Sequence, residues 1–308
     1  MPEKGIRSTY SQSPFQIYIC DDSGVISTGT AFLYRDSDES FLVTNWHNVS
    51  GKHFLSKEPL SQNPLTARFP THIKAKLSTY VDGDNVPAGS FTTVAHRINI
   101  YDPPTHQPLW YEHPILGSEC DVIALPFPKP DYVPECMHNH ANKISSTKIP
   151  VKPGNTVFII GYPKSISIGF GLPIWKSGFI ASEPHYDVTI DGEISEMGGL
   201  SDGKNLPAFF IDSLTREGLS GSPVFSSFFG MWDMTDPYKD PDPNSSDFWS
   251  RNDVAIGGNA TQFVGIYSGR LRDKEDKSAL GLCWREETII DVCRGKKLGT
   301  HPHIIKNE

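Results

Sequence analysis

The chain has 308 residues, of which 37% are hydrophobic and 11% aromatic, so it can bury a core and is not globally disordered. Its formal net charge of −8 excludes the basic surface of a general nucleic-acid binder, and no nucleic-acid partner is expected. No apolar run approaches the roughly 20 residues of a membrane span. A membrane partner is therefore not expected either.

The first residues of the chain and its cysteines indicate in which cellular compartment the protein resides. The first residues, "MPEKGIRSTYSQSPF", lack the apolar stretch of a secretory signal. The five cysteines are an odd and scattered set that does not read as a disulfide framework: Cys20, Cys120, Cys136, Cys283 and Cys293. We therefore predict a cytoplasmic protein, an interpretation that removal of a leader from the natural chain would undo.

In chain order, the apolar pattern is mostly that of β-strands. About a dozen short or alternating apolar runs are separated by turns rich in Gly, Pro and Asp, from "FQIYIC" and "GTAFLYRD" through "NTVFIIGYP" to "ALGLCW". So many short strands are typical of a barrel or a sandwich. One helix is predicted from Arg285, in "REETIIDVCRGKK", because acids begin it, bases end it, and Ile289, Ile290 and Cys293 form an apolar stripe.

Two segments depart from this pattern, residues 52–117 and 229–260, and both are predicted to contain long loops. The acids of the second segment could bind calcium, but they lack the spacing of a calcium loop, which favours a solvated loop. The segment "ECMHNH" brings Cys136, His138 and His140 together, yet no second ligand pair follows at zinc-site spacing. We expect no metal and no cofactor.

Three polar residues stand where strands meet loops. Ser220, in "REGLSGSPVF", lies either in an ordinary turn or in a bend that presents its hydroxyl beside free N–H groups. A serine nucleophile needs a base within reach, a group that orients the base, and N–H donors for the oxyanion. His47 ends the run "SFLVTNW", where a loop should lift it from the sheet, and Asp121 opens "DVIALPF". Taken alone, His47 could be a core residue and Asp121 a turn residue. Taken together, they would supply the base for Ser220 and the carboxylate that orients this base.

Several motifs share this order. The segments "LVTNWHNV", "CDVIALPF", "GLSGSPVF" and "FVGIYSGR" resemble, in sequence and order, those of the chymotrypsin-like serine peptidases. The segments "VFIIGYP", "WKSGFIAS" and "IDSLTREGLSGSPV" are similar to those of the bacterial HtrA-type branch of that family. The resemblance covers most of the chain except the two long segments. No PDZ domain is expected after the final helix.

The resemblance implies an all-β fold of two six-stranded antiparallel β-barrels with a C-terminal helix and two long loop insertions. The N-terminal barrel would comprise residues 1–140 and carry His47 and Asp121. The C-terminal barrel would comprise residues 141–308 and carry Ser220. The active site is then expected in the crevice between the two.

It also implies roles for the site residues in a serine endopeptidase. Ser220 would attack the peptide carbonyl and form an acyl-enzyme, His47 would transfer the proton, and Asp121 would orient His47. The backbone N–H groups of Gly218 and Ser220 would hold the oxyanion. The substrate would be a protein or peptide.

The implied substrate-binding residues are Leu214, Tyr267, Ser268, Gly269 and Arg270. Leu214 would lie at the base of the specificity pocket, which disfavours a Lys or Arg substrate side chain. Tyr267 and Arg270 would form walls, and the backbone of residues 268–270 would pair with the substrate as an added strand. Arg270 either selects an acidic side chain or points to solvent.

The sequence departs from the family at the activation device. Digestive members have an Asp before the serine that pairs with a freed N-terminus, whereas this chain has Leu219. The site is therefore either preformed or ordered by a protein partner, an oligomer or a loop. A catalytically silent scaffold on the same fold is the alternative function. An α/β-hydrolase esterase is disfavoured because Pro223 and a strand follow the serine.

Overall fold

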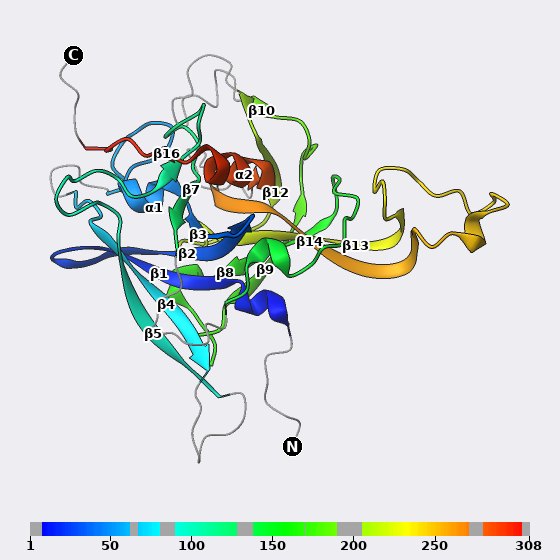
Figure 1. Ribbon diagram of the computed structural model, residues 1–308, viewed down its shortest axis with the longest axis horizontal. Helices are drawn as coiled ribbons and strands as arrows, with labels where there is room; N and C mark the ends of the chain where they lie inside the picture. Colours follow the sequence, from blue (N-terminus) through cyan, green and yellow to red (C-terminus); the bar gives the residue numbers. More distant parts are fainter. Residues whose placement is uncertain are drawn as a thin grey trace.

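The computed structural model of the chain describes residues 8–61, 67–80, 90–127, 138–169, 171–189, 205–270 and 280–303. These residues form mostly β-strands, arranged as an eight-stranded sheet, a six-stranded ring and a two-stranded ribbon (Figure 1). The all-β class predicted from the apolar pattern is confirmed.

The first sheet takes most of its strands from the first part of the chain. In space the order is β16-β6-β7-β3-β2-β1-β4-β5, and the pairs are antiparallel. Residues Phe15, Ile17 and Ile19 of β1 alternate along the strand and are buried on one face. The strand bounds are β1 Pro14–Asp21, β2 Gly24–Asp36, β3 Glu39–Thr44, β4 His72–Tyr80, β5 Phe91–Asn99, β6 Tyr111–Glu112, β7 Ile123–Pro126 and β16 Lys297–Leu298.

The second set of strands pairs in the order β12-β15-β14-β13-β8-β9, and β9 also pairs with β12, so the ring of pairings closes. Ile159, Ile211 and Val224 lie in its core. The bounds are β8 Thr156–Gly161, β9 Ile174–Ile180, β12 Ala208–Asp212, β13 Pro223–Asp233, β14 Val254–Arg270 and β15 Leu280–Arg285, and the ribbon is β10 Val188–Thr189 with β11 Asn205–Leu206.

The first half therefore differs from the six-stranded barrel that was expected. Its sheet has eight strands, with the hairpin of β4 and β5 at one end and β16 paired to β6 at the other. The contribution of β16 comes from the far end of the chain, and the two-residue pairing "KL" with "YE" is too short to carry a strand pattern in the sequence.

The predicted helix is α2, Glu286–Gly295, which begins one residue after and ends two residues before the bounds of the predicted segment. Ile289 and Cys293 are buried as the stripe predicted. Its ends contact the first sheet, since Tyr34 Oη donates to Glu286 Oε1 (3.0 Å) and Arg294 pairs with Asp36. The other helices are short: α1 Trp46–Ser50 and the 3₁₀ turns Thr9–Gln12, Ala141–Lys143, Pro163–Ser165 and Phe248–Ser250. Within the described residues, no helix is long and apolar enough to cross a bilayer.

The segment predicted as a loop over residues 229–260 contains a long loop, but it begins and ends in paired strands. β13 and β14 stay paired as far as Asp233 and Val254, so only residues 234–253 connect them. Arg251 forms ion pairs with Asp233 and Asp253 at the end of the hairpin. Backbone pairing and these charges hold strand ends whose Gly, Asp and Asn content is typical of loops, so the sequence pattern predicted the loop but not the strand ends that flank it. Figure 1 shows the hairpin projecting at the right of the molecule.

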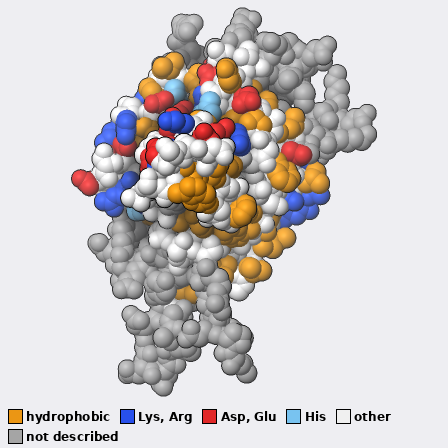
Figure 2. Space-filling view, turned by 90° about the vertical axis from the view of Figure 1, so that its right-hand side faces the viewer, with side chains coloured by type: hydrophobic (Ala, Val, Ile, Leu, Met, Phe, Trp, Pro, Cys, Tyr) orange, Lys and Arg blue, Asp and Glu red, His pale blue; other side chains and the backbone are white. Residues whose placement is uncertain are grey.

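The hairpin and its connecting loop expose large hydrophobic side chains. Phe229 is 74% exposed and Trp249 is 78% exposed. Figure 2, which faces this side of the molecule, shows hydrophobic side chains gathered near the centre with charged groups above them. Within residues 52–117, the apolar runs "HIKAKLSTY" and "FTTVAHRINI" form strands as their pattern predicts, and β4 and β5 pair along all nine residues of each.

The residues after α2 are docked onto the first sheet. Gly299 N–H donates to the carbonyl of Trp110 (2.9 Å), and Lys52 Nζ donates to the carbonyl of Pro302 (2.8 Å). His301 stacks on Tyr101 with ring centroids 4.7 Å apart. Up to residue 303, the tail is therefore part of the folded structure.

Candidate active site

His47 lies in a short helix and not in the predicted loop. β3 ends at Thr44, Asn45 is extended, and α1 begins at Trp46. The helix ends after one turn because Gly51 adopts a left-handed conformation (φ 70°), with its N–H donating to the carbonyl of His47 (3.0 Å). The sequence placed His47 correctly at the end of a strand, but the turn that presents it is helical.

The structure brings His47 and Asp121 together. His47 Nδ1 lies 2.8 Å from Asp121 Oδ2, and the backbone N–H of His47 donates to Oδ1 (2.9 Å). Asp121 is fully buried, whereas the His47 side chain keeps 16% of its surface exposed. The carboxylate contact requires the proton on Nδ1, which leaves Nε2 as an acceptor. This arrangement orients a base toward solvent or substrate.

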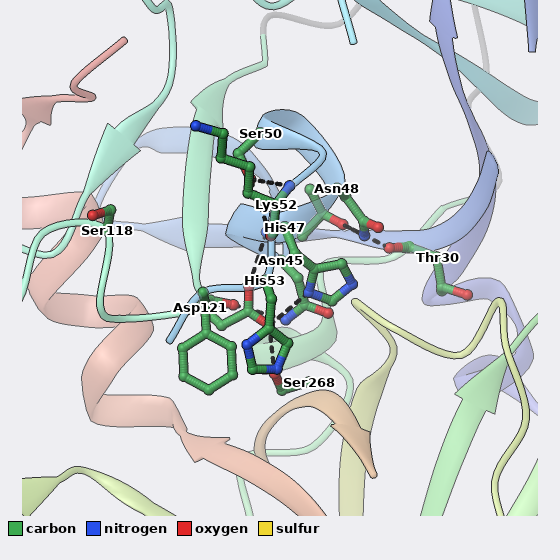
Figure 3. A network of polar contacts seen from close by, with 12 residues as sticks. Thr30, Asn45, His47, Asn48, Ser50, Lys52, His53, Ser118, Asp121 and Ser268 are labelled. Carbon is green, nitrogen blue, oxygen red and sulfur yellow. Dashed lines mark hydrogen bonds and ion pairs between the residues drawn. The ribbon is translucent and has the colours of Figure 1, made fainter. Parts of the chain in front are cut away.

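Ser268 is the third group on Asp121. Its hydroxyl donates to Asp121 Oδ2 and is buried, although the sequence suggested only a substrate-binding backbone here. Figure 3 shows His47 and Ser268 converging on Asp121. The Asn45 amide also donates to the carbonyl of Asp121 (2.8 Å). The donors from His47 and Ser268 satisfy the buried carboxylate, whose burial would otherwise be costly, and Asn45 satisfies the backbone carbonyl of the same residue.

Beneath α1 lies a buried glutamate that sequence reasoning missed. Oε1 of Glu112 accepts hydrogen bonds from the indole N–H groups of Trp46 (3.0 Å) and Trp110 (3.1 Å). Trp46 precedes His47, so this contact anchors α1 on β6. A glutamate in "YEHP" carries no signal that it is buried, because nothing local distinguishes it from a surface acid.

Ser220 lies in the loop between β12 and β13, and two glycines shape this loop. Gly218 (φ 91°) and Gly221 (φ 86°) both have left-handed backbones. A Cβ on Gly221 would overlap the carbonyl oxygen of Thr30, and one on Gly218 would overlap that of Tyr162. Only glycine allows both the dihedral angle and the close approach.

Hydrogen bonds tie the serine loop to the strands that lead to His47. Thr30 N–H donates to the carbonyl of Ser220 (2.9 Å), and Thr30 Oγ1 donates to that of Gly218 (2.8 Å). Thr44 Oγ1 donates to the carbonyl of Thr30 (2.9 Å), and Asn48 in α1 donates to Thr44 Oγ1 (2.9 Å). A continuous chain of contacts thus links the loop of Ser220 to the helix of His47.

The backbone around Ser220 offers two unused donors. The N–H groups of Leu219, Gly221 and Ser222 donate to the carbonyls of Arg216, Tyr267 and Leu219, respectively. Among the hydrogen bonds of the described residues, none uses the N–H of Gly218 or of Ser220. Two unpaired N–H groups that flank a serine can stabilise a negative oxygen that forms beside it.

The predicted substrate-binding residues differ in exposure. Leu214 is 60% exposed, so it does not form the base of a pocket in this structure. Tyr267 and Ser268 are buried. Gly269 and Arg270 are half-buried and pair with Leu282 and Gly281 of β15.

The candidate metal ligands serve other contacts. His138 is buried, and its Nε2 accepts from the N–H of Ser78 (2.9 Å). His140 Nε2 bonds to Ser40 Oγ (2.9 Å), and Cys136 lies outside the described residues. Within the described part of the chain, no three His, Cys, Asp or Glu side chains are grouped to hold a metal ion.

No protein-family model and no curated protein matches the chain. Solved structures resemble it over most of its length. The Rv3671c protease from M. tuberculosis, active form, is 14% identical with a TM-score of 0.45, covering 93% of this chain and 81% of that chain. The HtrA-type protease AlgW with a tripeptide is 13% identical with a TM-score of 0.43, covering 92% and 60%.

The serine endoprotease from Yersinia pestis is 12% identical with a TM-score of 0.39, covering 94% of this chain and 67% of that chain. These structural neighbours are HtrA-type and related serine proteases. At such low identity, the chemistry of this chain has to be argued from its own side chains.

Proposed function

We propose that this chain is a serine endopeptidase in which Ser220, His47 and Asp121 form the catalytic triad. The observation that carries the proposal is the 2.8 Å contact between His47 Nδ1 and the buried Asp121, in a helix linked by hydrogen bonds to the loop of Ser220. In this proposal, residues 1–140 and 141–308 act as the two lobes of a chymotrypsin-like fold, with the first sheet enlarged from six strands to eight.

The proposed reaction uses the groups of the site in sequence. His47 Nε2 accepts the proton of the Ser220 hydroxyl as Oγ bonds to the peptide carbonyl carbon, while Asp121 stabilises the imidazolium. The carbonyl oxygen becomes an oxyanion held by the N–H groups of Gly218 and Ser220. His47 then gives its proton to the leaving amine as the C–N bond breaks. His47 next takes a proton from water as its oxygen bonds to the acyl carbon, and returns the proton to Ser220 Oγ as the ester C–O bond breaks, which releases the acid.

The contacts around Ser220 support a loop that needs no N-terminal ion pair. Leu219 is buried in the core with Ile159 and Val224, where the digestive enzymes place an acid. An apolar side chain is satisfied there by packing alone, whereas a buried acid requires a cationic partner. We therefore propose a preformed site. Ordering by a partner protein or an oligomer is the alternative that the labelling experiment separates.

The remaining features of the proposal are its substrate and location. A protein or peptide substrate would pair with the backbone of residues 268–270 as an added strand. The four described cysteines, Cys20, Cys120, Cys283 and Cys293, are buried and unpaired, which is compatible with the reducing cytoplasm predicted from the sequence.

A fluorophosphonate probe and a quenched peptide library test the proposal. We expect labelling of Ser220 and peptide hydrolysis that falls by at least ~10³-fold in Ser220→Ala. Ser227→Ala is the matched control, because Ser227 is a strand serine whose hydroxyl bonds to Asn259 on the exposed side of the hairpin. Labelling only after addition of cell lysate would identify a latent enzyme. Absence of labelling with and without lysate would leave the scaffold interpretation.

A further inference from the structure

Tyr267 lies directly beside the proposed nucleophile. Its carbonyl accepts from the N–H of Gly221 (2.9 Å), and its N–H donates to the carbonyl of Ser222 (2.9 Å). These bonds fix the backbone of β14 against the two residues that follow Ser220. The side chain of Tyr267 is only 1% exposed, so it points into the protein between the segments that flank the serine.

The phenol of Tyr267 spans the space between these segments. Its hydroxyl is hydrogen-bonded to Thr215 Oγ1, in the loop that leads to Ser220. On β15, a Cβ placed on Gly281 would lie 2.6 Å from Cε2 and 3.1 Å from the hydroxyl oxygen of Tyr267. The absence of a side chain at Gly281 therefore makes room for this ring. Burial raises the pKa of Tyr267 to about 12, so the phenol stays neutral at physiological pH.

A substrate side chain would compete for the same space. The carbonyl that Ser220 attacks must lie at the N–H groups of Gly218 and Ser220. We call the substrate residue that contains this carbonyl the acyl-side residue. Its backbone pairs with residues 268–270. Its side chain then enters between the loop of Thr215 and the pair of β14 and β15. That volume is occupied by the ring.

We propose that Tyr267 restricts the acyl-side residue to a small side chain, no larger than valine. This inference rests on the proposed function and assigns its substrate class. The exposed position of Leu214 agrees with it, since a side chain that is 60% exposed is not enclosed by pocket walls. The specificity would thus be set by a tyrosine of the chain itself and not by the residue at the expected pocket base.

The experiment measures kcat/KM on matched peptides that differ only in the acyl-side residue, Ala or Phe. The wild-type protein should prefer Ala by at least ~10-fold, since a side chain that does not fit loses rate by this order or more. Tyr267→Ala should gain at least ~10-fold on the Phe peptide. Tyr267→Phe is the matched control: it retains the ring, loses only the hydroxyl, and should keep the preference for Ala.

A ligand that replaces the missing ring gives a second readout. p-Cresol has the shape of the deleted side chain, and apolar cavities made by such deletions bind matching aromatics. It should raise the Tm of Tyr267→Ala, restore the preference for Ala, and leave the wild-type protein unchanged. If Tyr267→Ala does not fold, Tyr267→Val and the wild-type profile still decide the matter.

The outcomes separate the two proposals. Wild-type preference for Phe, or an unchanged profile in folded Tyr267→Ala and Tyr267→Val, would overturn the role of Tyr267 while fluorophosphonate labelling of Ser220 still supported the peptidase. If Ser220 is labelled in no protein under any condition, the proposed function fails and the specificity role fails with it.

Discussion

The two sides of the site are held in place by different kinds of contact. His47 is oriented by side chains, because Asp121 binds its imidazole and its N–H, and Ser268 in turn donates to Asp121. The loop of Ser220 is held through its backbone, whose carbonyls accept hydrogen bonds from Thr30.

This difference determines which substitutions each side tolerates. On the side of the base, deleting one side chain removes one of several hydrogen bonds. On the side of the nucleophile, the backbone of the loop packs directly against the carbonyl oxygens of Thr30 and Tyr162. A Cβ added at one of its glycines would therefore displace the loop. Three substitutions test the comparison.

The largest effect is expected for Gly221→Ala. The methyl group would overlap the carbonyl oxygen of Thr30 and force a side chain into a left-handed backbone, at a cost of about 3 kcal/mol or more in the free energy of unfolding. Gly154→Ala is the control, because Gly154 has a similar φ of 85° with no atom within 4 Å of the added carbon. It should lose about 1 kcal/mol. Urea unfolding measures both, and equal losses would contradict the steric argument.

A smaller loss is expected for Glu112→Ala. It leaves the indole N–H groups of Trp46 and Trp110 without their acceptor in a buried site, which should cost about 2 kcal/mol of unfolding free energy. Glu112→Gln keeps an acceptor oxygen and should lose less than about 1 kcal/mol. Thermal and urea unfolding measure the difference. If the Ala variant were as stable as the Gln variant, the anchoring of α1 by Glu112 would be refuted.

The smallest effect is expected for Ser268→Ala, which removes one of the donors to Asp121 and leaves His47 in contact with it. As a positioning residue, Ser268 should affect kcat by ~10-fold and leave KM nearly unchanged, because one hydrogen bond to a charged group contributes about 1.5 kcal/mol. Ser227→Ala serves again as the exposed control. A fall in stability with no change in kcat would assign Ser268 a purely structural role.

The sequence predicted the elements whose apolar pattern is local. The helix from Glu286 buries one face, which leaves a period in the sequence, whereas the strands around Phe15, Leu42 and Ile159 bury consecutive positions and are marked by short apolar runs. The same reasoning placed His47 and Asp121 at strand ends, and the structure brings these two together.

Other features depend on partners far away in the chain and leave no such trace. The indole N–H of Trp46 bonds to Glu112 from 66 positions away, and the hydroxyl of Ser268 bonds to Asp121 from 147 positions away. The outer part of β13 and β14 is rich in residues typical of loops, yet it is held by backbone pairing, which does not depend on residue type. These are contacts of the tertiary structure, and single-residue preferences do not encode them.

The late arrival of β16 affects how the chain folds as it is made. Seven strands of the first sheet are complete at Pro126, whereas Lys297–Leu298 follow roughly 170 residues later. At the usual speed of a ribosome, this delay is on the order of ten seconds or more. Until β16 has been made, β6 is an edge strand of the sheet. The backbone N–H and C=O groups that later pair with β16 then have no strand partner, and β6 is the strand that carries Glu112. The strand that carries the glutamate beneath α1 thus gains its outer partner only after all strands of the second set have been made.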